Sequence, residues 1–108
     1  MSIEITDGFT MEPVDTFEFK VAHYRLYDKK KILKNGGYTT ITFVNEGLPF
    51  VMTARCSANE TYSRKKGIFE CIRKYCNKIH NKELLYLGKD PTGGYNAYVT
   101  SISKGEKQ

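Results

Sequence analysis

The pattern of hydrophobic and polar positions begins with a period of two. From residue 17 to about residue 27, apolar or aromatic side chains such as Phe19 alternate with polar ones, and most are β-favouring. This alternation predicts a strand with one buried face. Two further β-branched and aromatic segments, 38–44 and 50–56, flank Asn45-Glu46-Gly47, a sequence typical of a tight turn. The central part of the chain therefore predicts a β-hairpin, preceded by a glycine-containing turn at 34–37.

The period changes after residue 63. Residues 57–63 are polar and turn-like, and beyond them apolar side chains recur at steps of three and four, which predicts a helix over about 64–80. Ser63 is a candidate N-cap, because its hydroxyl can accept a hydrogen bond from the first turn. Three basic residues follow it at the positive end of the helix dipole, an unfavourable place that often marks function or an indifferent exposed site. The apolar stripe consists of Ile68, Ile72, Tyr75, Cys76 and Ile79.

The remaining segments complete a simple element order. Residues 84–87 predict a short buried strand, 90–94 a turn, and 95–102 another alternating strand. Residues 1–15 have no sustained periodicity and predict an irregular acidic N-terminal arm. The expected fold is α+β, an antiparallel sheet of about five strands with one amphipathic helix packed on one face, forming a single domain over 16–103.

Composition narrows the class of protein. The chain has 108 residues, of which 40% are hydrophobic, so it has room for one core. No apolar run is long enough to cross a membrane, and the polar, acidic start does not resemble a signal peptide. Three cysteines are too few and odd in number for a disulfide framework. These features predict a cytoplasmic protein without a membrane partner.

The charge is unevenly distributed along the chain. Residues 1–18 hold five carboxylates and no Lys or Arg, whereas residues 19–108 hold 17 basic residues against seven acidic ones, about +10. Such an asymmetry has two interpretations. In one, the acidic segment folds back onto the basic residues 19–108, and in the other these residues bind a polyanion or an acidic protein surface.

Two basic clusters are the strongest functional signal. One lies in the loop that follows the first predicted strand, and the other lies along the predicted helix, whose other side is apolar. The candidate binding residues are Lys29, Lys30, Lys31, Lys34, Arg64, Lys65, Lys66, Arg73, Lys74 and Lys78. Three interpretations remain open: contact with a phosphate backbone, docking on an acidic protein surface, and a solvated face that serves solubility alone.

Catalytic and metal chemistry have little support in the sequence. Cys76 and His80 are separated by one helical turn, but a metal site would also need Cys56 and His23 to converge from strands. The chain has no Cys-x-x-Cys pair. The sequence also identifies no third residue that would orient the histidine of a Cys/His nucleophilic pair. We expect no metal, no cofactor and no enzymatic activity.

The middle of the chain resembles a known class of small proteins. After the hairpin come Thr53-Ala54-Arg55-Cys56-Ser57, then Asn59-Glu60-Thr61-Tyr62-Ser63, and then Lys66-Gly67-Ile68 at the start of the helix. This order is similar to uncharacterised proteins of phages and prophages of Gram-positive bacteria, although Glu60-Thr61 replaces their usual acidic pair. The resemblance is a packing signature and not a catalytic one, so it says little about activity. It implies a phage context and an accessory role, such as the inhibition of host defence nucleases by anti-CRISPR proteins.

Together these observations predict a non-enzymatic, phage-type accessory protein in the host cytoplasm. It is expected to bind and modulate a host protein or nucleoprotein complex, such as a defence nuclease. The alternative is direct, sequence-tolerant binding of DNA or RNA by the same basic residues.

Overall fold

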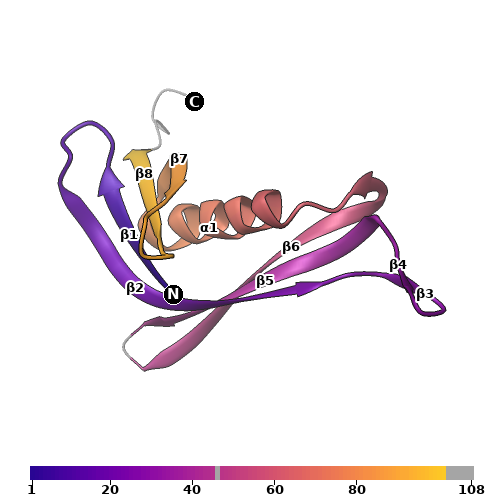
Figure 1. The fold of residues 1–108 in the computed structure, drawn as a ribbon. Coiled ribbons are helices and arrows are strands. Elements are labelled where there is room, and N and C mark those ends of the chain that lie inside the picture. The colour runs from indigo at the N-terminus through magenta and orange to yellow at the C-terminus, as the bar shows by residue number, and fades with distance from the viewer. Residues whose placement is uncertain (46, 102–108) are drawn as a thin grey trace. The chain divides into compact units, whose positions relative to one another are not determined.

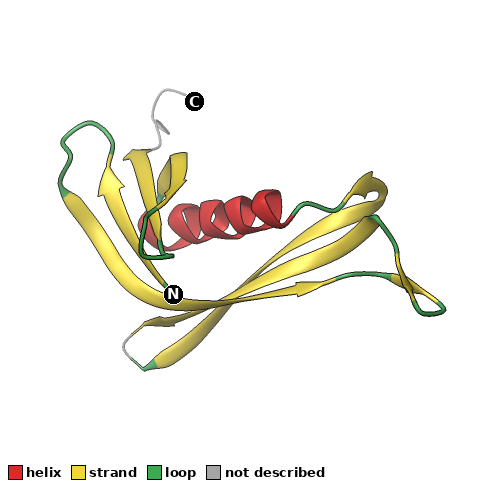
Figure 2. Cartoon of the chain, in the orientation of Figure 1, coloured by secondary structure: helices red, strands yellow, loops and turns green. Residues whose placement is uncertain are grey.

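The structure is a computed structural model that describes residues 1–45 and 47–101. Glu46, part of the predicted hairpin turn, and Ile102, the predicted end of the last strand, lie outside these residues. In chain order the elements are β1 (Ser2–Asp7), β2 (Pro13–Tyr24), β3 (Tyr27–Asp28), β4 (Lys31–Ile32), β5 (Asn35–Asn45), β6 (Leu48–Thr61), α1 (Arg64–His80), β7 (Lys82–Lys89) and β8 (Tyr95–Ser101) (Figures 1 and 2).

The strands form a mixed sheet in an α+β fold. Six strands hydrogen bond in the order β6-β5-β2-β1-β8-β7, while β3 and β4 pair separately. β1 runs parallel to β8 and antiparallel to β2. The fold class is therefore confirmed, but the prediction of about five antiparallel strands is wrong in detail. The sixth strand is β1, and its pairing with β8 joins the two ends of the chain, which local patterns do not report.

The chain divides into two compact units that share β2 and α1. Unit 1 contains Met1–Glu18 and Arg73–Gln108, and unit 2 contains Phe19–Ile72.

Unit 1 is built around β1, in the segment predicted to be irregular. That prediction is wrong, because Ile3 and Ile5 are fully buried and β1 is hydrogen bonded on both sides. The short alternation of isoleucines with polar residues is a strand pattern, too brief to stand out beside Gly8 and Pro13. In the same unit the rings of Phe17 on β2 and Tyr75 on α1 lie 4.6 Å apart.

Unit 2 is built on the β5–β6 hairpin. The predicted hairpin is confirmed by antiparallel pairing from Asn45↔Leu48 back to Tyr38↔Arg55. The strands are longer than predicted: β6 continues to Thr61, so the turn-like interpretation of 57–63 is wrong, and β5 already begins at Asn35, within the predicted turn. The backbone there keeps positive φ values of 78° and 113° at Gly36 and Gly37, where a bulge shifts the register.

The predicted helix is confirmed at both ends. It spans Arg64–His80, and the backbone N–H of Lys66 donates to Ser63 Oγ at 3.2 Å, the expected N-cap. Within unit 2 the first half of α1 packs closely on β5. A Cβ added at Gly67 would lie 2.8 Å from Thr39 Cβ, and the Cys71 thiol donates to the Thr39 carbonyl oxygen at 3.4 Å.

A candidate basic binding surface

The structure divides the ten predicted binding residues between the two units. Seven lie in unit 2: Lys29, Lys30, Lys31, Lys34, Arg64, Lys65 and Lys66. The other three, Arg73, Lys74 and Lys78, lie on the part of α1 that belongs to unit 1. All ten are exposed except Arg73, which is half-buried.

The positive charge of the protein resides in unit 2. By sequence, unit 2 carries ten Lys and Arg against four Asp and Glu, a net of +6, whereas unit 1 carries seven against eight, a net of −1. Carboxylates of the N-terminal segment have partners inside unit 1. Asp15 lies 2.8 Å from His80 Nε2, and Asp7 lies 3.9 Å from Lys82 Nζ. Unit 1 is therefore close to neutral. Carboxylates of the acidic N-terminal segment contact basic side chains within the same unit.

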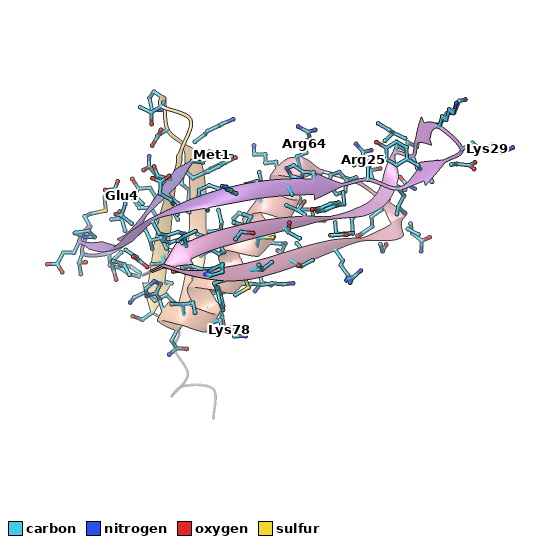
Figure 3. All side chains as sticks on the ribbon, turned by 90° about the horizontal axis from the view of Figure 1, so that it is seen from below. Met1, Glu4, Arg25, Lys29, Arg64 and Lys78 are labelled. Atoms are coloured by element: carbon cyan, nitrogen blue, oxygen red, sulfur yellow. The ribbon has the colours of Figure 1, made fainter. Side chains whose placement is uncertain are left out.

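Four of the basic residues lie on the small β3–β4 hairpin or directly after it. Asp28 pairs with Lys31 across the hairpin, so Lys29 and Lys30 form its two-residue loop (Figure 3). Lys29 has a φ of 55°, a left-handed conformation that favours glycine and costs a lysine some stability. A lysine is thus held at the tip of the hairpin against the local backbone preference, which is the kind of broken rule found at functional sites.

The hairpin and the start of the helix are tied to the same end of the β5–β6 ladder. Asn35 pairs with Thr61, and the backbone N–H of Tyr62 donates to the Lys34 carbonyl oxygen at 2.8 Å. Lys34 therefore lies beside the segment that leads directly into Arg64.

Arg25 strengthens this junction. Its Nη2 donates to the Leu33 carbonyl oxygen at 2.8 Å, and its guanidinium carbon lies 4.8 Å from the centre of the Tyr62 ring. We call the seven predicted binding residues of unit 2 the basic end: Lys29, Lys30, Lys31, Lys34, Arg64, Lys65 and Lys66.

Tyr62, which lies next to the basic end in the chain, belongs to a polar cluster. His23 Nδ1 lies 2.6 Å from the Tyr62 hydroxyl and 3.0 Å from Thr39 Oγ1, and the Tyr62 hydroxyl donates to the Tyr38 carbonyl oxygen at 3.1 Å. Burial, and secondarily the nearby charge of Arg64, lower the pKa of His23 below its ordinary value. The cluster holds Tyr62 in place and favours a neutral imidazole beside the cationic surface.

Sequence reasoning missed a row of planar side chains on the other face of the same strands. The rings of Tyr24 and Tyr38 stack with centroids 4.7 Å apart, and the guanidinium carbon of Arg55 lies 5.7 Å from the centre of the Tyr38 ring. Once the turn of the β5–β6 hairpin is placed, its antiparallel register sets Tyr38 opposite Arg55. The contact between these two side chains could therefore have been predicted from the sequence. The position of Tyr24 depends on β2 lying next to β5, which the local pattern does not specify.

Metal ligation and cysteine reactivity depend on how His, Cys, Asp and Glu side chains are placed in the described part of the chain. No group of three or more His, Cys, Asp and Glu side chains there could hold a metal ion. Burial and the nearby Asp15 raise the pKa of Cys76 to about 12, so its thiol stays protonated. His80, the residue one turn away, instead contacts Asp15.

Comparison with known proteins gives no family. No protein-family model, curated protein sequence or solved structure matches the chain. Within residues 1–45 and 47–101, no helix has the length and apolar character needed to cross a membrane.

Proposed function

We propose that the protein is a non-enzymatic nucleic-acid-binding protein whose basic end contacts the phosphate backbone. The observation that carries the proposal is the state of these seven side chains. All seven are exposed, and none forms an ion pair within 4 Å of a carboxylate in the described residues. They also belong to a unit with a net charge of +6. Unpaired cations on two segments that are joined at one end of the β5–β6 ladder are the electrostatic footprint of a polyanion-binding surface.

The strength of this binding should depend steeply on salt. Each phosphate neutralised by Lys or Arg releases condensed counterions, so the logarithm of affinity falls linearly with the logarithm of salt concentration. The slope is about −0.7 for each contact to a single strand, so seven contacts set a limit of about −5.

Fluorescence anisotropy with a labelled oligonucleotide at a series of salt concentrations tests the proposal. The triple variant Lys29→Gln, Lys30→Gln and Lys31→Gln should bind more weakly, with a slope shallower by about 2 units. A matched control removes the same charge from unit 1 through Lys74→Gln, Lys78→Gln and Lys89→Gln, and it should leave the slope nearly unchanged. Equal effects of the two variants would show that net charge alone matters. No binding to any oligonucleotide at low salt would contradict the proposal itself.

A second candidate is the phage-type accessory role, in which the basic end docks on an acidic protein such as a host defence nuclease. One observation favours it: the β3–β4 hairpin exposes apolar side chains beside its lysines. Tyr27 is 63% exposed and Ile32 is 55% exposed, and aromatic anchors beside cations are typical of protein interfaces. Affinity capture from nuclease-treated host lysate distinguishes the candidates, because a stoichiometric protein that survives the treatment would favour the accessory role.

A further inference from the structure

The sheet of unit 2 has one face that does not pack against α1. Thr39, Ile41 and Phe43 of β5 are buried, and Thr39 lies against Gly67 and Cys71 of α1. Side chains alternate between the two faces of a strand, so Tyr38 and its neighbours at even positions point away from the helix. Seen from below, β5 and β6 lie in front of the first half of the helix, the part that belongs to unit 2 (Figure 3). This outer face remains partly exposed along both strands, as Val44 and Val51 show.

A row of planar groups crosses this outer face. Tyr24 of β2, Tyr38 of β5 and Arg55 of β6 come from three neighbouring strands and lie side by side. Only one face of the Tyr24 ring packs on Tyr38, and the side chain remains 48% exposed. Arg55 is also exposed. The row therefore ends on each side in a planar group that is open to solvent.

A hollow lies beside this row. It has a volume of about 510 Å³ and is lined by Leu26, Gly37, Tyr38, Arg55, Cys56 and Ser57. This volume falls in the range of sites that take small organic ligands, and the lining combines apolar surface with a few polar groups. Gly37 is fixed here by its φ of 113° and by the close approach of the Tyr24 carbonyl oxygen, so no side chain fills the hollow from this position.

One wall of the hollow is hydrogen bonded to the segment that carries the lysines of the basic end. Leu26, one of its walls, accepts a backbone hydrogen bond from Leu33 at 2.9 Å, at the base of the β3–β4 hairpin. Lys34 follows directly in the chain. A ligand that reached from the hollow to the basic end would therefore meet planar groups first and cations next.

We propose that the outer face of unit 2 binds the bases of single-stranded nucleic acid, which stack on Tyr24 and Arg55 and enter the hollow beside Tyr38, while the basic end holds the phosphates. This inference rests on the proposed function and names its substrate class. Every base has a flat π-face that stacks on aromatic rings and guanidinium planes, so such a platform is tolerant of sequence. A duplex keeps its bases stacked and paired inside, and so it offers the platform nothing.

The chemistry of the platform predicts which substitution matters. Loss of a stacking ring typically weakens single-strand binding by about five-fold to a hundred-fold. Tyr24→Leu removes the exposed ring but keeps an apolar side chain, and Tyr24→Phe keeps the ring and removes only the hydroxyl. Tyr86 provides a matched control, because it is an exposed tyrosine of unit 1, 61% exposed, on β7.

The test compares three labelled probes of equal length at one salt concentration: oligothymidine, an abasic single strand, and a duplex. Wild type should bind oligothymidine more tightly than the abasic strand. Tyr24→Leu should lose about five-fold to a hundred-fold of its affinity for oligothymidine and keep its affinity for the abasic strand, while Tyr24→Phe and Tyr86→Leu should resemble wild type.

The possible failures are distinguishable. Equal affinity of wild type for oligothymidine and for the abasic strand would overturn the base platform and leave phosphate binding intact. Unchanged binding of oligothymidine by Tyr24→Leu would also overturn it. Failure to bind any of the three probes at low salt would instead overturn the proposed function.

Discussion

Replacing Gly67 by alanine should have two opposing effects on the free energy of unfolding. In an exposed helix interior this change stabilises a protein by about 1 kcal/mol, because alanine has the higher helix propensity. Here the new Cβ would meet the side chain of Thr39, with its Cβ only 2.8 Å away and Oγ1 closer still. Thr39 is fully buried and its hydroxyl hydrogen bonds with Tyr62 at 2.5 Å, so a displacement of its side chain would disturb that hydrogen bond.

The balance favours destabilisation. Overpacking a buried contact costs about 1–3 kcal/mol, and displacing Thr39 also disturbs hydrogen bonds worth about 1 kcal/mol each. After the gain in helix propensity, the free energy of unfolding should fall by about 2 kcal/mol. For a domain of this size that corresponds to a decrease in Tm of about 8–16 °C.

Chemical and thermal denaturation followed by circular dichroism measure this effect. Asn77→Ala, at an exposed position of the same helix, is the control and should raise stability by a few tenths of a kcal/mol. In a Thr39→Ala background the cost of Gly67→Ala should shrink, because the nearest atom is gone. If Gly67→Ala stabilised the protein as the control does, the close approach of α1 to β5 would be wrong.

Three further predictions concern single side chains. Lys29→Gly should leave stability unchanged or raise it by up to about 1 kcal/mol in urea denaturation, because φ is positive at this position, yet it should weaken oligonucleotide binding; a loss of stability would contradict the strained loop. The lowered folded-state pKa of His23 means that the unfolded chain binds its proton more readily, so stability should be full above the ordinary histidine pKa and should fall as pH decreases through the folded-state value. His23→Gln should flatten that part of the pH profile, and an identical profile would refute the assignment. Asp15→Asn should weaken the contact with His80 and lower the free energy of unfolding by about 1 kcal/mol at neutral pH, with no effect on oligonucleotide binding measured by anisotropy.

Local patterns in the sequence predicted the elements whose sequence signals are local. The helix over 64–80 and its Ser63 cap follow from a 3.6-residue apolar period and one hydroxyl, and both are present as predicted. The β5–β6 hairpin follows from two β-favouring runs around a tight turn. In each case the signal that identifies the element lies within its own residues.

Long-range pairing explains what the sequence did not predict. β1 is stabilised by β8, about 90 residues further along the chain, and only this pairing makes the short Ile3 and Ile5 alternation a buried strand. The extension of β6 to Thr61 depends likewise on Asn35 of the partner strand. The basic residues were predicted as one helix face plus a loop, whereas the structure groups Lys34 with Arg64 through the hydrogen bond from Tyr62.

An NMR titration of the isotope-labelled protein with single-stranded oligothymidine at low salt would locate the binding surface residue by residue. Binding by the basic end and the outer face of unit 2 should shift the backbone signals of residues 29–34 and 64–66 and those around Tyr24 and Tyr38, with the signals of Lys74 and Lys78 little changed. An unchanged spectrum at saturating oligonucleotide, or shifts confined to unit 1, would contradict it.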